Sequence, residues 1–295
     1  MEKLIGYLRL MRPANVVTSV ADVLAGMAIS GYFIMTATGS VQLLPVVLLC
    51  ISTVGLYSGG IIMNDVFDAE LDAKERPERP IPSGLISKQA ATLFGGICFF
   101  IGLVAAGLYS PSSQYLAAAI MISCLIYDKF LKHSAFFGPL NMGLCRGLNL
   151  LLGVSILPAQ IQEWWYLAII PIIYIAAITM ISRGEVHGGN TSVLYFAMAL
   201  YALVIISVLY YAFSNNNLPV TIAFLIGFTF MIFQPLLIAL KNPIGPNIGK
   251  AVKAGVIALI LLNAAWASAF GSWHVALFIV ILLPLSMWLS KAFAV

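Results

Sequence analysis

Residues 43–84 read LLPVVLLCISTVGLYSGGIIMNDVFDAELDAKERPERPIPSG, in which an apolar run is followed directly by an acidic segment. The apolar run over 43–63 is long enough to cross a hydrocarbon core of about 30 Å as an α-helix. Six of the chain's 11 acidic residues follow it, namely Asp65, Asp68, Glu70, Asp72, Glu75 and Glu78. The stretch therefore predicts a membrane-spanning helix that carries a cluster of carboxylates to the membrane surface.

The same apolar pattern recurs along the whole chain of 295 residues, of which 61% are hydrophobic and only 9% are charged. The mean hydropathy of +1.01 overrides the length-based expectation of one or two soluble domains. A further run near 275–290 contains Pro284 and is left open as a span, a tilted helix or a re-entrant segment. The predicted fold class is an all-α, polytopic transmembrane bundle of nine to ten helices, forming a single domain over 1–295. We predict spans near 16–37, 43–63, 90–109, 114–131, 138–157, 164–182, 191–213, 219–240 and 251–270.

The basic residues predict the orientation of the bundle. No Lys or Arg occurs in the loops near 38–42, 110–113, 158–163, 214–218 and 271–274, whereas the alternate loops contain them. By the positive-inside rule, the N-terminus and the acidic segment then face the cytoplasm. Lys291 would lie on the same side if the last run crosses, which favours ten spans over nine. The net charge of +4 follows from this topology and does not indicate nucleic-acid binding.

The spacing of three aspartates in the acidic segment predicts a shared cation. Asp65, Asp68 and Asp72 are spaced i, i+3, i+7, which places all three carboxylates on one face of a helix. Carboxylate oxygens suit Mg²⁺, whose coordination is often completed by substrate phosphates. The alternative is an ordinary solvated loop. The cation interpretation is favoured because a carboxylate at the end of an apolar span is costly unless it is functional, and because Pro77, beyond the register, stops the helix.

Polar residues inside other spans point to the interior of the bundle. Asp22 either lines a cavity or pairs with a buried cation such as Arg146, and the sequence leaves both alternatives open. Asn141 and Asn149 lie on the same predicted helix as Arg146. The four cysteines occur singly within apolar runs, so neither a zinc site nor a disulfide framework is indicated. We expect them to be small core residues: Cys50, Cys98, Cys124 and Cys145.

These residues carry a resemblance to a known family. The string N64-D65-V66-F67-D68-A69-E70-L71-D72, followed by R79-P80-I81-P82-S83-G84, resembles the first signature of the UbiA superfamily of intramembrane prenyltransferases. Arg12-Pro13 with Asn15 resembles the motif at the start of the family's first helix. The segment from Tyr127 to Lys132 resembles the end of the fourth helix, and the segment 138–153 resembles the fifth.

The second signature of the family is altered in this chain. Family members usually carry another acidic cluster after the sixth helix, where this chain has SRGEVHGGN over 182–190. Glu185 can stand for the first acid, but His187 and Asn190 occupy places where carboxylates are expected. The string is similar to that of the EboC-type branch of UbiA-like proteins, which is found in bacterial gene clusters. A Glu, an imidazole and an amide bring less negative charge to a cation than a carboxylate cluster.

The resemblance implies an intramembrane prenyltransferase with a central cavity that faces the cytoplasm. It implies that Asp65, Asp68, Asp72 and Glu185 hold Mg²⁺ and serve in catalysis. The implied partners are a prenyl diphosphate, a lipophilic and often aromatic acceptor, and membrane lipids, with no nucleic acid. The implied location is a bacterial inner membrane, with the acidic loops in the cytoplasm. The residues expected to bind substrate are Asn15, Asn64, Arg79, Tyr127, Lys132, Arg146, Arg183, His187 and Asn190.

The altered second signature keeps a second function open. A UbiA-like component could bind or transport a lipophilic metabolite with weak or no transferase activity. An ordinary secondary transporter is disfavoured, because the two halves of the chain do not repeat and the charge lies in one surface cluster rather than at the midplane.

Overall fold

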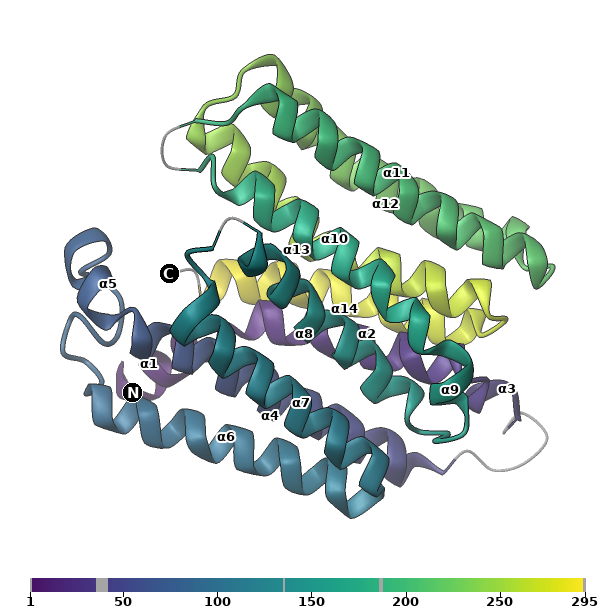
Figure 1. Ribbon diagram of the computed structural model, residues 1–295, viewed down its shortest axis with the longest axis horizontal. Helices are drawn as coiled ribbons and strands as arrows, with labels where there is room; N and C mark the ends of the chain where they lie inside the picture. Colours follow the sequence, from purple (N-terminus) through teal and green to yellow (C-terminus); the bar gives the residue numbers. More distant parts are fainter. Residues whose placement is uncertain (1, 36–41, 135, 186–187, 294–295) are drawn as a thin grey trace.

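The computed structural model describes residues 2–35, 42–134, 136–185 and 188–293, and within these ranges the chain forms helices and no strand (Figure 1). This confirms the all-α prediction. The helices in chain order are α1 (Glu2–Met11), α2 (Pro13–Ile29), α3 (Tyr32–Met35), α4 (Leu43–Phe67), α5 (Ala69–Glu75), α6 (Lys88–Tyr109), α7 (Pro111–Ile126), α8 (Phe137–Val154), α9 (Gln160–Trp164), α10 (Ile169–Ser182), α11 (Thr191–Ser214), α12 (Leu218–Lys241), α13 (Gly245–Ala269) and α14 (Trp273–Ala292).

Eight helical segments of the described chain are long and apolar enough to cross a membrane, and α2 is a shorter apolar helix of 17 residues. The protein is therefore an integral membrane protein. α14 runs through Pro284 as one helix, which supports a crossing at the C-terminal end. The choice between nine and ten spans stays a prediction, because the helices qualify by length and composition alone.

Two predicted spans differ from the structure: one helix ends earlier than predicted, and another predicted span is divided into consecutive helical segments. The span expected over 16–37 ends at Ile29, and Gly31 then adopts a φ of +83°, a left-handed conformation that glycine accepts without strain. Residues 36–37 lie outside the described chain. The span expected over 164–182 consists of the short α9, a 3₁₀ turn over Trp165–Ala168, and α10.

The helices lie roughly side by side in one bundle (Figure 1). α4 packs along α6, and α2 lies among α8, α13 and α14. α11 and α12 form one edge of the bundle, next to a core that includes Tyr174, Tyr201, Phe228 and Trp266. Because lipid gives no hydrophobic drive to helix association, close packing at small residues holds such bundles together.

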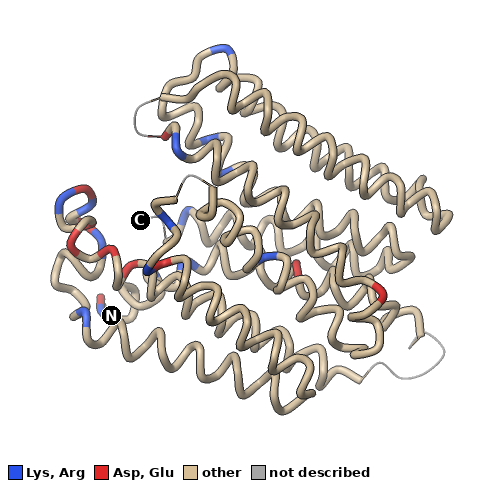
Figure 2. The backbone as a smooth tube through the Cα atoms, in the orientation of Figure 1, with Lys and Arg blue, Asp and Glu red and all other residues tan. Residues whose placement is uncertain are grey.

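Charged residues gather at one end of the bundle (Figure 2), together with α1, α5 and both chain ends. Most of the long helical surface between the two ends carries no charge in the same view. This distribution is what a membrane-spanning bundle requires, because charged side chains are costly in hydrocarbon. The charged end is the one that the loop pattern assigns to the cytoplasm, and that assignment stays a prediction.

Candidate functional site

A cavity of about 260 Å³ lies inside the bundle, between α2, α4, α7, α8, α10 and α13. Along α4 its lining extends from Asn64 to Thr53, which corresponds to about 16 Å of helix at 1.5 Å per residue. Much of its wall is apolar, with Leu56, Ile120 and Ile175 among the lining residues. The cavity therefore begins at Asn64, the first residue of the motif, and continues inward between apolar helices.

The three aspartates of the first motif each contact a basic side chain from another segment. Arg12, between α1 and α2, donates to Asp65 with a nitrogen–oxygen distance of 2.5 Å. Arg79, in the loop after α5, lies 2.6 Å from Asp72 and 3.4 Å from Asp65. Lys132 donates to Asp68.

Burial makes this charge cluster different from a solvated loop. The Asp65 and Asp72 residues are only 5% and 4% exposed. Buried carboxylates are stable when they are paired and hydrogen-bonded. The four acid–base contacts therefore gather three distant parts of the chain next to the end of the cavity that Arg12 and Asn64 line, which we call its entrance.

The backbone around the motif bends where the sequence predicts one continuous helix. α4 ends at Phe67 and α5 begins at Ala69, while Asp68 between them has φ −87° and ψ 1°. The hydrogen bonds from Asp68 N to Asn64 O and from Asp72 N to Asp68 O persist at 2.9 and 2.8 Å. The three aspartates therefore keep nearly helical spacing without sharing one uninterrupted helix. The helix stops at Glu75, before Pro77, as predicted.

Arg12 occupies an unusual backbone conformation. Its φ is +46°, in the left-handed region that non-glycine residues seldom adopt. Pro13 follows as the first residue of α2. This junction changes the chain direction between α1 and α2 and places the Arg12 guanidinium against Asp65. Arg12 belongs to the motif quoted above, but the sequence reasoning did not place it among the site residues.

A π-helical turn over Tyr127–Leu131 follows α7. The amide of Lys132 donates to Tyr127 O at 3.0 Å, so one extra residue is accommodated before Lys132 reaches Asp68. Such turns recur at functional sites. The turn also brings Tyr127 and Asp128 to the cavity wall.

Asp128 is a site residue that the sequence reasoning missed. Its Oδ1 accepts a hydrogen bond of 2.9 Å from the Asn64 amide, and its buried Oδ2 has no hydrogen-bond partner among the described residues. It is the only carboxylate among the described residues that line the cavity. A carboxylate within an apolar span is a signal that could have found it.

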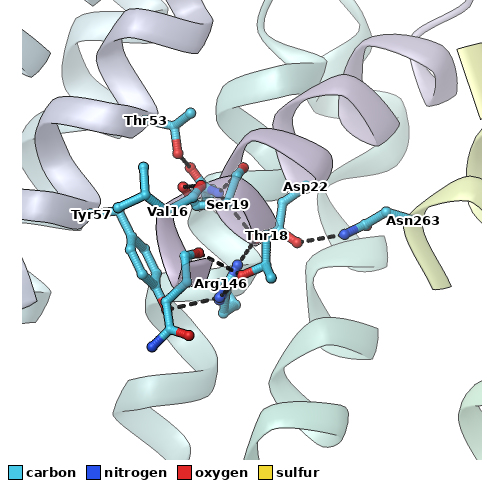
Figure 3. Close-up of polar contacts among 10 residues, drawn as sticks. Val16, Thr18, Ser19, Asp22, Thr53, Tyr57, Arg146 and Asn263 are labelled. Atoms are coloured by element: carbon cyan, nitrogen blue, oxygen red, sulfur yellow. Dashed lines mark hydrogen bonds and ion pairs between the residues drawn. The ribbon is translucent and has the colours of Figure 1, made fainter. Parts of the chain in front are cut away.

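A second polar network lies deeper in the bundle, centred on Asp22 and Arg146 (Figure 3). The Asp22 carboxylate accepts hydrogen bonds from Arg146 at 2.6 Å, Asn263 at 2.7 Å and Asn149 at 3.1 Å. Arg146 also donates to the hydroxyls of Thr18 at 2.7 Å and Tyr57 at 2.8 Å. The open alternative for Asp22 is thereby decided: it pairs with Arg146. The arginine also lines the cavity, together with Tyr57 and Asn149.

The second motif does not reach the cavity lining in the described chain. Arg183 donates to Ser134 O at 2.6 Å, and the Asn190 side chain caps α11 by accepting from Ser192 N at 2.9 Å. Burial raises the pKa of the Glu185 carboxyl above its usual value, and the positive charge of Arg76 opposes this shift. His187 lies outside the described residues. Asn15, by contrast, lines the cavity, and its role in substrate binding stays a prediction.

The structure gathers part of the expected cation site without showing a ready metal centre. Within the described ranges, no group of three His, Cys, Asp or Glu side chains is arranged to hold a metal ion. The aspartates of the first motif instead contact Arg12, Arg79 and Lys132. Magnesium binding by Asp65, Asp68, Asp72 and Glu185 stays a prediction.

The four cysteines are predicted to be small core residues: Cys98 is buried in one core cluster, Cys50 and Cys124 pack partly buried against another, and the expectation for Cys145 stays a prediction. Cys124 and Cys145 line the cavity, and their sulfur atoms are 3.8 Å apart. Single-sequence spacing could not show this, because the two residues lie on different helices, α7 and α8, that pack together.

Part of the chain is similar in sequence to curated proteins. Over 146 residues the chain is 37% identical to digeranylgeranylglyceryl phosphate synthase of Methanothrix thermoacetophila, covering 50% of this chain and 52% of that protein. It is 31% identical over 176 residues to the protein of that name from Saccharolobus solfataricus, covering 59% of each. The chain thus spans about half to three-fifths of the length of these curated relatives.

A solved structure with the same fold is a UbiA homologue from Archaeoglobus fulgidus bound to GPP and Mg²⁺. The TM-score is 0.63 at 17% identity, over 86% of this chain and 99% of that one, and this likeness shows the fold. The family model described as the UbiA prenyltransferase family matches residues 24–246, which include the first motif, the π-helical turn and the altered second motif. The resemblance to the EboC-type branch stays a prediction, but the wider assignment is shown: the chain belongs to the UbiA prenyltransferase family.

Proposed function

We propose that this protein transfers a prenyl group from a prenyl diphosphate to a lipophilic acceptor inside the membrane. One observation carries the proposal: three carboxylates and three basic side chains form a cluster, and Arg12 of this cluster lines one end of a cavity with a largely apolar wall. The charged entrance suits a diphosphate, and the apolar interior suits a prenyl chain. Family membership supports the same reaction class.

The oxygen donors at the entrance fit Mg²⁺. Asp65, Asp68 and Asp72 would hold it, with Glu185 as the contribution of the second motif. When bound, Mg²⁺ supplies Lewis-acid stabilisation of the leaving diphosphate. The homologue from Archaeoglobus fulgidus is bound to Mg²⁺ and GPP, which supports this assignment.

Side chains of this protein would bind the diphosphate at this entrance and exclude water from the cavity. Arg12, Arg79 and Lys132 now neutralise the aspartates, and on donor binding they turn to the diphosphate oxygens, where negative charge grows as the prenyl C–O bond breaks. Asn64, held by Asp128, stays at the cavity wall beside the donor. The apolar wall keeps water away from the allylic cation, so that the acceptor captures it instead.

The acceptor is the finer part of the proposal. Relatives named digeranylgeranylglyceryl phosphate synthase make that product the first one to look for. The assay would supply geranylgeranyl diphosphate with geranylgeranylglyceryl phosphate, since their condensation gives the named product. We also propose that the entrance faces the cytoplasm. The bacterial inner membrane stays an expectation from the EboC-type resemblance, and these relatives come from archaea.

Calorimetry with a prenyl diphosphate analogue that cannot ionise tests the donor site. We expect binding that requires Mg²⁺ in the native protein and fades in Asp68→Ala. Transfer should fall about 10²–10³-fold in this variant, by analogy with the loss of one charge-stabilising group elsewhere. Glu78→Gln is the matched control, because Glu78 is an exposed acid of the same loop. Undiminished Mg²⁺-dependent binding by Asp68→Ala would overturn the cation site.

A binding or transport function is the second candidate, and the second motif favours it. Asn190 is engaged as a helix cap, and Glu185 does not line the cavity. Diphosphate release separates the two functions, because a transferase ionises its donor and a carrier does not. A protein that binds the donor analogue but releases no diphosphate from the natural donor, with any acceptor supplied, supports the carrier.

A further inference from the structure

Cys124 and Cys145 form a pair of thiols inside the membrane domain. Their sulfur atoms are 3.8 Å apart, and both residues line the cavity. The other two cysteines, Cys50 on α4 and Cys98 on α6, do not line it. All four are free thiols in the structure. The pair is thus set apart both by the closeness of its sulfurs and by its access to the cavity.

The pair lies where three helices approach one another. Cys124 belongs to α7 and Cys145 to α8, which pack together. On α4, a Cβ built on Gly60 would lie 3.0 Å from the Cys124 sulfur, so α4 comes close to the pair as well. A disulfide requires the sulfurs to move from 3.8 Å to about 2.05 Å. The sulfurs already contact each other, so the approach that remains is small compared with the width of a helix.

The surroundings decide which reagents can oxidise the pair. Much of the cavity wall around the pair is apolar, so a reagent must leave water to reach the two sulfurs. The pair should therefore resist large, water-soluble disulfides and react with a small membrane-permeant oxidant that enters the cavity.

We propose that Cys124 and Cys145 are a modification site: an oxidisable dithiol whose disulfide joins α7 to α8 across the cavity wall. In the reaction each thiol loses its hydrogen and one S–S bond forms. A diazene oxidant such as diamide accepts the two electrons and two protons, so that its N=N bond becomes HN–NH. Reduction by a dithiol reverses the step.

The position of the pair gives the disulfide a consequence that rests on the proposed function. Cys124 lies three residues before Tyr127, where the π-helical turn that leads to Lys132 begins. Cys145 directly precedes Arg146, which lines the deeper part of the cavity. A bond between the two helices draws their cavity-facing sides together. Donor binding should then weaken at least tenfold in the oxidised protein and recover on reduction.

The test uses the full-length protein in detergent, treated with diamide and then with a maleimide. Peptide mass spectrometry should find a disulfide between 124 and 145. The double variant Cys50→Ala/Cys98→Ala keeps the pair, and oxidation should make both of its remaining thiols unreactive toward the maleimide. The double variant Cys124→Ala/Cys145→Ala lacks the pair, and its two remaining thiols, Cys50 and Cys98, should still react with the maleimide after oxidation. Single alanine variants of the pair serve if a double variant folds poorly.

The outcomes separate this proposal from the proposed function. If no 124–145 disulfide forms in the folded protein, or if Cys50 or Cys98 is oxidised equally, the modification site is overturned. If the disulfide forms but binding of the donor analogue is unchanged, the predicted weakening of donor binding is wrong. If the reduced protein binds no prenyl diphosphate at all, the proposed function fails, while the mass-spectrometric result still judges the thiol pair.

Discussion

The Asp22–Arg146 pair is a residue-scale feature with a large expected effect on stability. Both residues are at least 95% buried, and their 2.6 Å contact is supported by Asn149, Asn263, Thr18 and Tyr57. Removing one partner leaves an uncompensated charge, which typically costs about 3–5 kcal/mol. We therefore expect Asp22→Asn and Arg146→Met each to lower the free energy of unfolding by about this amount in mixed micelles.

The double variant tests whether Asp22 and Arg146 stabilise the bundle as a pair. Asp22→Asn with Arg146→Met removes both charges, so the destabilisation should be clearly smaller than the sum of the two single effects. Thr92→Ala, at an exposed position on α6, serves as a control with little effect. Additive losses in the double variant would show that the two side chains stabilise the bundle independently.

Residue types in the sequence predict which side chains gather, but they do not predict their partners. Asp65, Asp68, Asp72, Arg79 and Lys132 meet as the motif suggests. Contacts with Arg12 and Asp128 were missed, because they depend on a left-handed residue and a π-helical turn. Neither backbone feature has a periodic signal in one sequence. Pairing across 53 or 64 positions is fixed by how the helices pack.

At the scale of whole helices, the crossing of α2 and α8 depends on two glycines. A Cβ on Gly26 would lie 2.1 Å from Leu150 O, and one on Gly153 would lie 2.1 Å from Val23 O. These neighbours are backbone atoms that cannot move without shifting a helix. We expect Gly26→Ala to destabilise the protein by about 3 kcal/mol or more, at or beyond the usual range for overpacking. Thermal unfolding in detergent measures the loss.

Gly96→Ala is the matched control for this crossing. Gly96 lies inside α6, and a Cβ there would meet nothing within 4 Å. Alanine is the better helix former by about 1 kcal/mol, so this variant should be neutral or slightly stabilising. Equal behaviour of the Gly26 and Gly96 variants would contradict the close approach of α2 and α8.

Hydropathy located most helices of the bundle and misjudged the places where they break. The runs expected over 191–213 and 219–240 agree closely with α11 and α12. The run over 16–37 was too long, because the apolar residues after Gly31 continue the pattern without continuing α2. Apolar composition reports membrane depth, whereas helix ends depend on local backbone geometry.

At the scale of the whole molecule, the sequence predicts an all-α membrane bundle, and the packing order of its helices comes from the structure alone. α2 packs against α14 near the opposite end of the chain, a contact for which one sequence holds no periodic signal. The cavity depends on such contacts, since its wall combines residues from α2, α4, α7, α8, α10 and α13. The acidic motif therefore indicates the chemistry of the site from the sequence alone, whereas the cavity is seen only in the structure.

Orientation in the membrane is a whole-molecule property that labelling can decide. The absence of Lys and Arg from alternate loops predicts that the acidic motif and the second motif face the cytoplasm. In a variant with all four cysteines changed to alanine, single cysteines are introduced by Ser83→Cys and Thr191→Cys, both at exposed positions. The second substitution leaves the Asn190 cap of α11 intact. Gln162→Cys, at an exposed position of the short helix α9 in the segment 158–163 that has no Lys or Arg, reports the opposite side. An impermeant maleimide added to intact cells should label only the Gln162 variant, and permeabilisation should expose the other two. Labelling of Ser83→Cys in intact cells would invert the topology and place the proposed diphosphate site outside the cytoplasm.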